Sequence, residues 1–232
     1  MKYNTSMKII YLIIISVLCF LSIFLGGKKF RSTALYALAI GGVVNSNFFH
    51  PLDYPIMCFG LPFGIDSIIY TLFVFCVIVM FFKSGKGSAY TLLISSIVAI
   101  MFSAIMQLFS DLLSTGSSTE CWQSFLNFSI SAVASLIALS IMLEIMQKLK
   151  NKNLNEYLIL LIAILIATVA DSILYLGAFS LINGIIENFG KLLLASIIGK
   201  TIAILCSIGC YYLINLFDSK PTKSKSNEQI EQ

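Results

Sequence analysis

Seven apolar stretches separated by short polar loops constrain this chain more than any other feature of its sequence. Most of them approach the roughly 20 residues that an α-helix needs to cross the hydrocarbon core of a bilayer. Of the 232 residues, 58% are hydrophobic and 11% are charged, whereas a soluble domain carries about 25% charged residues. We therefore predict an all-α polytopic membrane protein, with a six-helix transmembrane core preceded by one extra N-terminal transmembrane helix. The seven predicted spans are Met7–Leu25, Ser32–Val44, Ile56–Phe82, Ala89–Leu108, Phe125–Met146, Tyr157–Ile182 and Leu192–Phe217.

The spans divide the chain into three parts. Residues 1–30 hold the N-terminal helix, which follows Lys2 and Lys8 as a signal peptide would. Its exit, Gly26-Gly27-Lys28-Lys29, is basic and lacks the A-x-A type of cleavage site, so we expect this helix to be retained. Residues 31–217 form the six-span core. Residues 218–232 are rich in Lys, Ser, Glu and Gln and are expected to be a disordered cytoplasmic tail.

Basic residues alternate between the loops. Every second loop carries Lys or Arg, and the loops between them carry almost none. Because cytoplasmic loops of membrane proteins carry the excess of positive charge, this pattern predicts a multi-pass protein of the cell (inner) membrane with a cytoplasmic C-terminus. The basic groups are Lys28, Lys29 and Arg31, then Lys83 and Lys86, then Lys148, Lys150 and Lys152, and finally Lys220, Lys223 and Lys225.

Three ionisable residues fall well inside predicted spans: Asp66, Asp171 and Lys200. An ionisable group at this depth is costly and usually faces a cavity or a partner. Asp171 and Lys200 could offset each other's desolvation, either as an ion pair that joins two helices or as a substrate-binding pair. Asp66 follows a Gly- and Pro-containing helix start that can line a polar cavity. Glu144 lies nearer the cytoplasmic side, where we expect it to reach the interface or pair with a loop lysine.

Polar residues also end two spans on the outer side. Two explanations fit these positions equally well: helix capping with turn formation, or ligand binding. The residues are Asn45, Asn47 and Gln107. Together with the buried ionisable residues they predict one polar pocket that opens to the outside. The candidate substrate-binding residues are Asn45, Asn47, Asp66, Gln107, Asp171 and Lys200.

Several activities are excluded by the residue inventory. His50 is the one histidine, and the six cysteines form no CxxC pair, which leaves too few ligands for a metal site. The chain has no phosphate-binding GxxxxGK[ST] run and no basic face for nucleic acid. We expect a non-enzymatic protein without a cofactor, whose partners are a small-molecule substrate, the bilayer, and possible additional subunits: a separate energising module or copies of itself.

Two alternatives of other classes stay open. An intramembrane aspartyl protease would use Asp66 and Asp171 as two carboxylates that share a proton. A non-transporting assembly subunit would use the buried charges only to hold helices together.

Four segments of the core resemble a known family. Arg31–Leu38 through Asn45–Asn47, Pro62–Asp66, Ala170–Leu174 and Gly199–Thr201 are similar to the vitamin uptake transporter family that includes the queuosine precursor transporters. The resemblance covers about residues 31–217. It implies a plan like that of the substrate-binding subunits of energy-coupling-factor transporters, with six helices and a solute pocket near the outer face.

The resemblance also implies a ligand and residue roles. The ligand would be a queuosine precursor, a 7-deazaguanine base bearing a cyano or aminomethyl group. Asp66 and Asp171 would accept hydrogen bonds from the base edge or the amine. Lys200 would hold Asp171 or a ligand acceptor, and Asn45 and Asn47 would form the rim.

Overall fold

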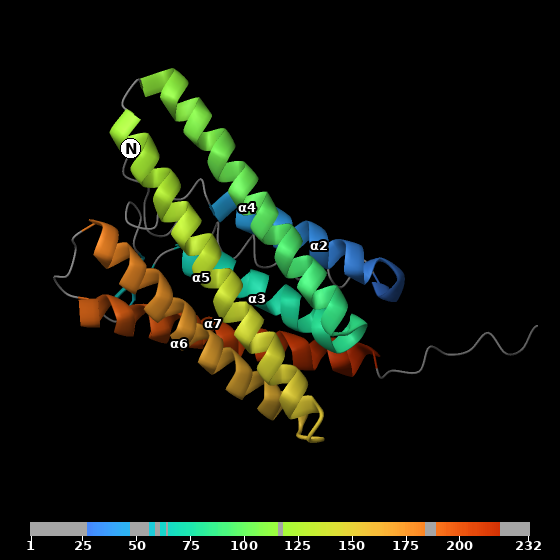
Figure 1. Ribbon diagram of the computed structural model, residues 1–232. Helices are drawn as coiled ribbons and strands as arrows, with labels where there is room; N and C mark the ends of the chain where they lie inside the picture. Colours follow the sequence, from blue (N-terminus) through green and yellow to red (C-terminus); the bar gives the residue numbers. More distant parts are fainter. Residues whose placement is uncertain are drawn as a thin grey trace, which may run out of the picture.

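Helices account for nearly all of the chain that the computed structural model describes (Figure 1). The structure describes residues 27–46, 56–58, 61–63, 65–115, 118–183 and 189–218. Its helices are α2 (Gly27–Ser46), α3 (Ile65–Ser84), α4 (Lys86–Thr115), α5 (Ser118–Lys150), α6 (Glu156–Asn183) and α7 (Phe189–Asp218). The predicted helical class is confirmed. The N-terminal helix expected before Gly27 and the tail expected after Asp218 lie outside the described residues.

Within the described residues, three helices are long and apolar enough to cross a membrane: Lys86–Ser114, Cys121–Lys150 and Glu156–Ile182. At a rise of 1.5 Å per residue, 30 residues extend about 45 Å, which exceeds the roughly 30 Å hydrocarbon core. Shorter apolar stretches occupy Ser32–Gly41 in α2 and Phe73–Ser84 in α3. These lengths indicate a membrane-embedded protein, and the number of seven spans stays a prediction.

The outward face of α4 carries a stripe of exposed large apolar side chains. They recur three or four residues apart, so they share one side of the helix. An apolar stripe of this length is unfavourable in water but matches lipid chains. Its most exposed members are Ile94 (54%), Val98 (62%), Phe102 (65%), Met106 (55%), Phe109 (58%) and Leu113 (89%).

The helices close into a bundle in chain order. Each helix from α3 to α7 packs against the next one, and α7 also packs against α3. Outside this ring, α2 packs against α3 and α4. The α4 and α5 helices lie side by side in Figure 1. The core is deepest around α3, where every residue from 73 to 81 is buried.

A short antiparallel hairpin replaces the start of the third predicted span. Strand β1 (Ile56–Cys58) pairs with β2 (Leu61–Phe63), with Met57 opposite Pro62. The predicted span of residues 56–82 was therefore too long at its start, because α3 begins only at Ile65. Glycine and proline disfavour a helix here. Proline has no N–H to donate, and an edge strand tolerates it because one side of such a strand has no partner that needs that donor.

Two tight junctions determine how consecutive helices meet. Gly85 alone separates α3 from α4 and has a φ of 92°, a conformation that glycine adopts without steric cost. Between α5 and α6, Asn153 has a φ of 55°, which asparagine tolerates better than most residues. The Oδ1 atom of Asn155 then accepts the Tyr157 N–H at 2.9 Å and caps the start of α6.

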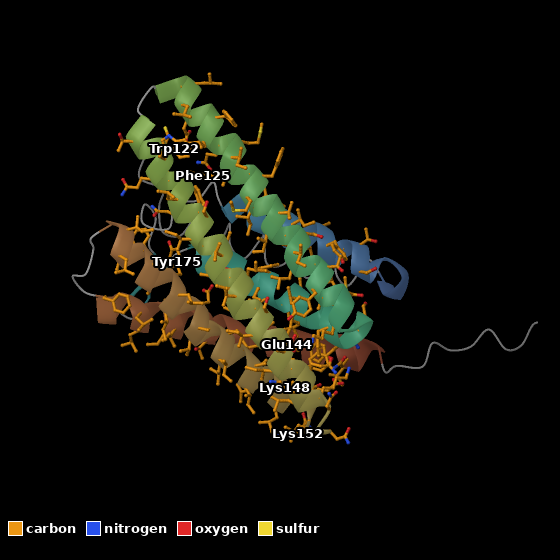
Figure 2. All side chains as sticks on the ribbon, viewed as in Figure 1. Trp122, Phe125, Glu144, Lys148, Lys152 and Tyr175 are labelled. Atoms are coloured by element: carbon orange, nitrogen blue, oxygen red, sulfur yellow. The ribbon has the colours of Figure 1, made fainter. Side chains whose placement is uncertain are left out.

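Contacts between distant segments bring these junctions to one end of the bundle. Lys83 Nζ donates to Asn215 Oδ1 of α7 at 2.7 Å, and Lys150 Nζ of α5 lies 5.5 Å from the centroid of the Phe81 ring. We call this end, which also carries Lys86 and Lys152, the basic end. In Figure 2, Lys148 and Lys152 lie at this end, and Trp122 and Phe125 lie at the opposite one.

Candidate functional site

A buried carboxylate lies in the middle of the bundle. Asp171 of α6 is only 4% exposed, and its Oδ1 accepts a hydrogen bond from Ser135 Oγ of α5 at 3.2 Å. Ser135 is itself 6% exposed. Ser135 has apolar neighbours on both sides, and Asp171 lies between Ala170 and Ser172. An ionised carboxylate at this depth depends on polar contacts to offset its desolvation.

The carboxylate lies near the midpoint of its span. Asp171 follows the first residue of α6, Glu156, by 15 residues and precedes the last, Asn183, by 12. At 1.5 Å per residue these separations correspond to about 22 Å and about 18 Å. Ser135 is likewise close to the middle of α5. The Asp171 carboxylate is therefore far from both ends of the bundle.

Hydroxyl groups from four helices contact Asp171 or lie on or contact its neighbours along α6. Ser172 Oγ of α6 lies 3.1 Å from Ser196 Oγ of α7, and Thr168, one turn before Ser172, is 2% exposed. From α3, the buried hydroxyl of Tyr70 interacts electrostatically with Asp171. We call these residues, Asp171, Ser135, Thr168, Ser172, Ser196 and Tyr70, the Asp171 cluster. The cluster combines one carboxylate with several groups that can both donate and accept hydrogen bonds.

Packing differs between the two halves of the bundle. The largest fully buried side chains in the described part all lie in the half nearer the basic end: Leu35, Ile78, Met80, Phe81, Leu92, Leu93, Leu139, Met142, Leu143, Met146 and Tyr211. In the opposite half, all six consecutive residues from 175 to 180 of α6 are partly exposed. Six consecutive residues cover every side of a helix. Among the residues whose side chains are described, burial is therefore greater between the Asp171 cluster and the basic end than on the other side of the cluster.

Two buried oxygen atoms on α4 have no hydrogen-bond partner within the described residues. They are Oγ of Ser96, which is 0% exposed, and Oε1 of Gln107. Because 11 residues make slightly more than three whole turns, the two positions lie on the same side of α4. A buried polar oxygen without a partner is costly, so these atoms are candidates for contacts with a bound solute or water.

The structure describes the side chains of only two of the six predicted site residues. Asp171 and Gln107 lie inside the bundle as described above. Asn45 belongs to the last turn of α2, Asp66 to the first turn of α3 and Lys200 to α7, but their side chains lie outside what the structure describes. Asn47 lies outside the described residues altogether. The Asp171–Lys200 pair accordingly stays a prediction.

Sequence reasoning missed the serines of the site. Ser135, Ser172, Ser196 and Ser96 were not selected because serine is common in membrane helices and each hydroxyl can bond to its own helix. Ser129 does this, since its Oγ donates to the Phe125 carbonyl at 2.9 Å. The sequence contains no signal that separates such locally satisfied serines from those that face a neighbouring helix.

Glu144 behaves as the sequence predicts. Its Oε1 forms an ion pair with Lys86 Nζ at 2.7 Å and accepts a hydrogen bond from Tyr90 Oη at 3.0 Å. The pair joins α5 to the start of α4 near the basic end. Glu144 is half exposed and lies nine residues closer to the basic end of α5 than Ser135, so this contact is separate from the Asp171 cluster.

Within the described ranges, no group of three or more His, Cys, Asp or Glu side chains could hold a metal ion. A scan against protein-family models and searches of curated proteins and of solved structures gave no match to this chain.

Proposed function

We propose that this protein is a membrane importer of a small vitamin-like or nucleobase-like solute that binds at the Asp171 cluster. The observation that carries the proposal is the nearly complete burial of the Asp171 carboxylate at mid-span, with Ser135 as a donor. Ionisable groups at this depth most often serve a substrate or ion pathway, because a purely structural role would not repay their desolvation. In this proposal the basic end faces the cytoplasm, as the charge pattern of the loops predicts.

Access to the cluster follows from the packing of the bundle. The half near the basic end is filled by large buried side chains, among them Phe81 and Tyr211, whereas α6 is partly exposed on every side from residue 175 to residue 180. A solute would therefore reach Asp171 from the end opposite the basic end. This arrangement supports the outward-facing polar pocket that the sequence predicts.

The chemistry of the cluster suits a planar base with several N–H groups. A carboxylate accepts two adjacent N–H donors, such as those on the edge of a guanine-like base, or binds an ammonium group. The Tyr70 phenol offers a further donor or acceptor near the same carboxylate. A 7-deazaguanine queuosine precursor, which the sequence resemblance implies, satisfies these requirements and is the substrate that we propose.

The test is growth-linked uptake. The protein is expressed in a bacterium that cannot make 7-deazaguanines, each base is supplied at low concentration, and queuosine is measured in tRNA. We expect uptake with the unmodified protein, loss with Asp171→Asn, and little change with Asp111→Asn, a carboxylate near the far end of α4. All three proteins must be present in the membrane in equal amounts.

Two outcomes would contradict the proposal. Absence of uptake by the unmodified protein would remove the 7-deazaguanine substrate. Unchanged uptake by Asp171→Asn would remove Asp171 from the site and favour the alternative in which the buried charge only holds helices together.

A further inference from the structure

A cluster of aromatic and charged side chains joins four helices at the basic end of the bundle. Lys150 Nζ of α5 lies over two rings of α3, 5.5 Å from the centroid of Phe81 and 5.8 Å from that of Phe82. Tyr211 Oη of α7 donates to Glu156 Oε2 of α6 at 3.1 Å. The rings of Phe82 and Tyr211 are in contact, with centroids 5.5 Å apart. We call these five residues the basic-end latch.

The latch joins two parts of the bundle. Lys150 is the last residue of α5 and Glu156 the first of α6, so both flank the short turn of residues 151–155. Their partners belong to α3 and α7, which are bonded to each other through Lys83 and Asn215. The latch therefore attaches the turn end of the α5–α6 hairpin to the α3–α7 pair.

The Asp171 cluster is divided between the same two parts. Asp171 and Ser135 belong to the α5–α6 hairpin, whereas Tyr70 belongs to α3 and Ser196 to α7. A displacement of the hairpin away from α3 and α7 would therefore break the latch and separate the polar groups around Asp171 in one movement. Release of a bound solute requires both events.

The latch residues also form the barrier itself. Phe81 is 1% exposed and Tyr211 is 2% exposed, so large rings fill the bundle at this level. The contacts that hold them are of modest strength, because a cation over a ring at a partly exposed site and a single hydrogen bond each contribute little. Such contacts can keep a closed state populated and still open within a transport cycle.

We infer that the basic-end latch is the gate through which the solute leaves the Asp171 cluster, and that it opens when the α5–α6 hairpin swings away from α3 and α7. The inference rests on the proposed transport function, and it adds the moving element and the contacts that hold it closed.

The test measures access to the site without any solute. All six natural cysteines are replaced, Ser135→Cys is introduced as a reporter, and a membrane-impermeant maleimide is applied to sealed vesicles of either orientation. The latch variant combines Lys150→Met with Tyr211→Phe, which removes the cation and the hydroxyl but keeps the ring. The control combines Lys148→Met with Tyr212→Phe, the same changes at exposed neighbouring positions.

We expect the latch variant to be labelled about five times faster than the control from the side of the basic end, the combined effect of losing two modest contacts. Labelling from the opposite side should not increase. Equal rates in the latch and control variants would overturn the inference. So would a similar increase from both sides, because that result indicates general loosening of the bundle.

A second reporter covers the case in which Ser135→Cys disturbs folding. Thr168→Cys occupies a buried position of the same cluster on α6 and should give the same contrast between the latch and control variants. The labelling is independent of solute identity. A protein that fails to import 7-deazaguanines but shows the contrast would retain the gate and lose the proposed substrate. Import without the contrast would retain the proposed function and lose the gate.

Discussion

The Ser135–Asp171 hydrogen bond allows a quantitative test of how the site is held. Ser135→Ala removes the hydroxyl that donates to Asp171 Oδ1 at 3.2 Å, in a place where both side chains are more than nine-tenths buried. The substitution leaves the backbone of α5 unchanged and removes one oxygen atom. A buried carboxylate then loses a donor that water cannot replace easily.

The magnitude follows from the geometry. A hydrogen bond to a charged group contributes about 1.5–3 kcal/mol. The oxygens are slightly farther apart than the usual range of about 2.5–3.0 Å for such bonds, so we use the lower value. A loss of about 1.5 kcal/mol changes the folding equilibrium roughly tenfold and lowers the melting temperature of a chain of this size by about 3–6 °C.

The assay is thermal unfolding in detergent micelles, followed by far-ultraviolet circular dichroism. Ser129→Ala is the matched control, because this serine lies on the same helix and donates to the Phe125 carbonyl of its own helix. Its melting temperature should stay within about 1–2 °C of the unmodified protein, as expected for a change within roughly 0.5 kcal/mol.

A double-mutant cycle isolates the charged part of the interaction. In an Asp171→Asn background, Ser135→Ala should cost about 1 kcal/mol less, because the remaining hydrogen bond joins two neutral groups. The reasoning would be refuted if Ser135→Ala melted together with Ser129→Ala, or if its cost were the same in both backgrounds.

Three further predictions concern the membrane and the packing. Lys152→Cys should react with an impermeant maleimide from the cytoplasmic side and Thr119→Cys from the outer side; reversed sides would contradict the proposed orientation. Phe102→Lys, on the exposed stripe of α4, should reduce membrane insertion by about 2.5–3.5 kcal/mol, whereas Leu113→Lys near the helix end should insert almost normally. Equal insertion of these two variants would argue against lipid contact. Ala163→Leu, at a fully buried position of α6, should destabilise the bundle by about 1–3 kcal/mol in thermal unfolding, and an unchanged melting temperature would show that the site has spare room.

Local sequence information was sufficient for the helical class and for the approximate positions of the described helices. Hydropathy sums over about 20 consecutive residues, so it does not depend on which helices become neighbours. Hydropathy detects only the apolar part of a helix, so the described helices extend beyond the predicted spans. The α5 helix runs from Ser118 to Lys150, whereas its apolar window covers only residues 125–146. Polar residues at the ends of these helices can lie outside the hydrocarbon core and still be helical.

The loop charges and the Gly- and Pro-rich segment before Asp66 were also informative. Glu144 pairs with a loop lysine, as its depth in the span suggested. Gly60 and Pro62 indicated a broken helix start, but pairing of β1 with β2 requires a return of the chain that hydropathy does not encode. The sequence therefore predicted where the helix is interrupted, and only the fold showed that the interruption is a hairpin of β1 and β2.

The partners of the buried carboxylate were decided only by the tertiary structure. The sequence predicts that Asp171 pairs with Lys200, which stays a prediction, and it gave no sign of the hydrogen bond from Ser135, 36 residues earlier on a different helix. Depth along a helix can be counted from the sequence, but the rotation of that helix is determined by packing against its neighbours. Rotation decides whether a serine faces lipid, its own backbone or a carboxylate across the bundle. For this reason the sequence alone predicted the burial of Asp171, whereas the Ser135 contact required the assembled helices.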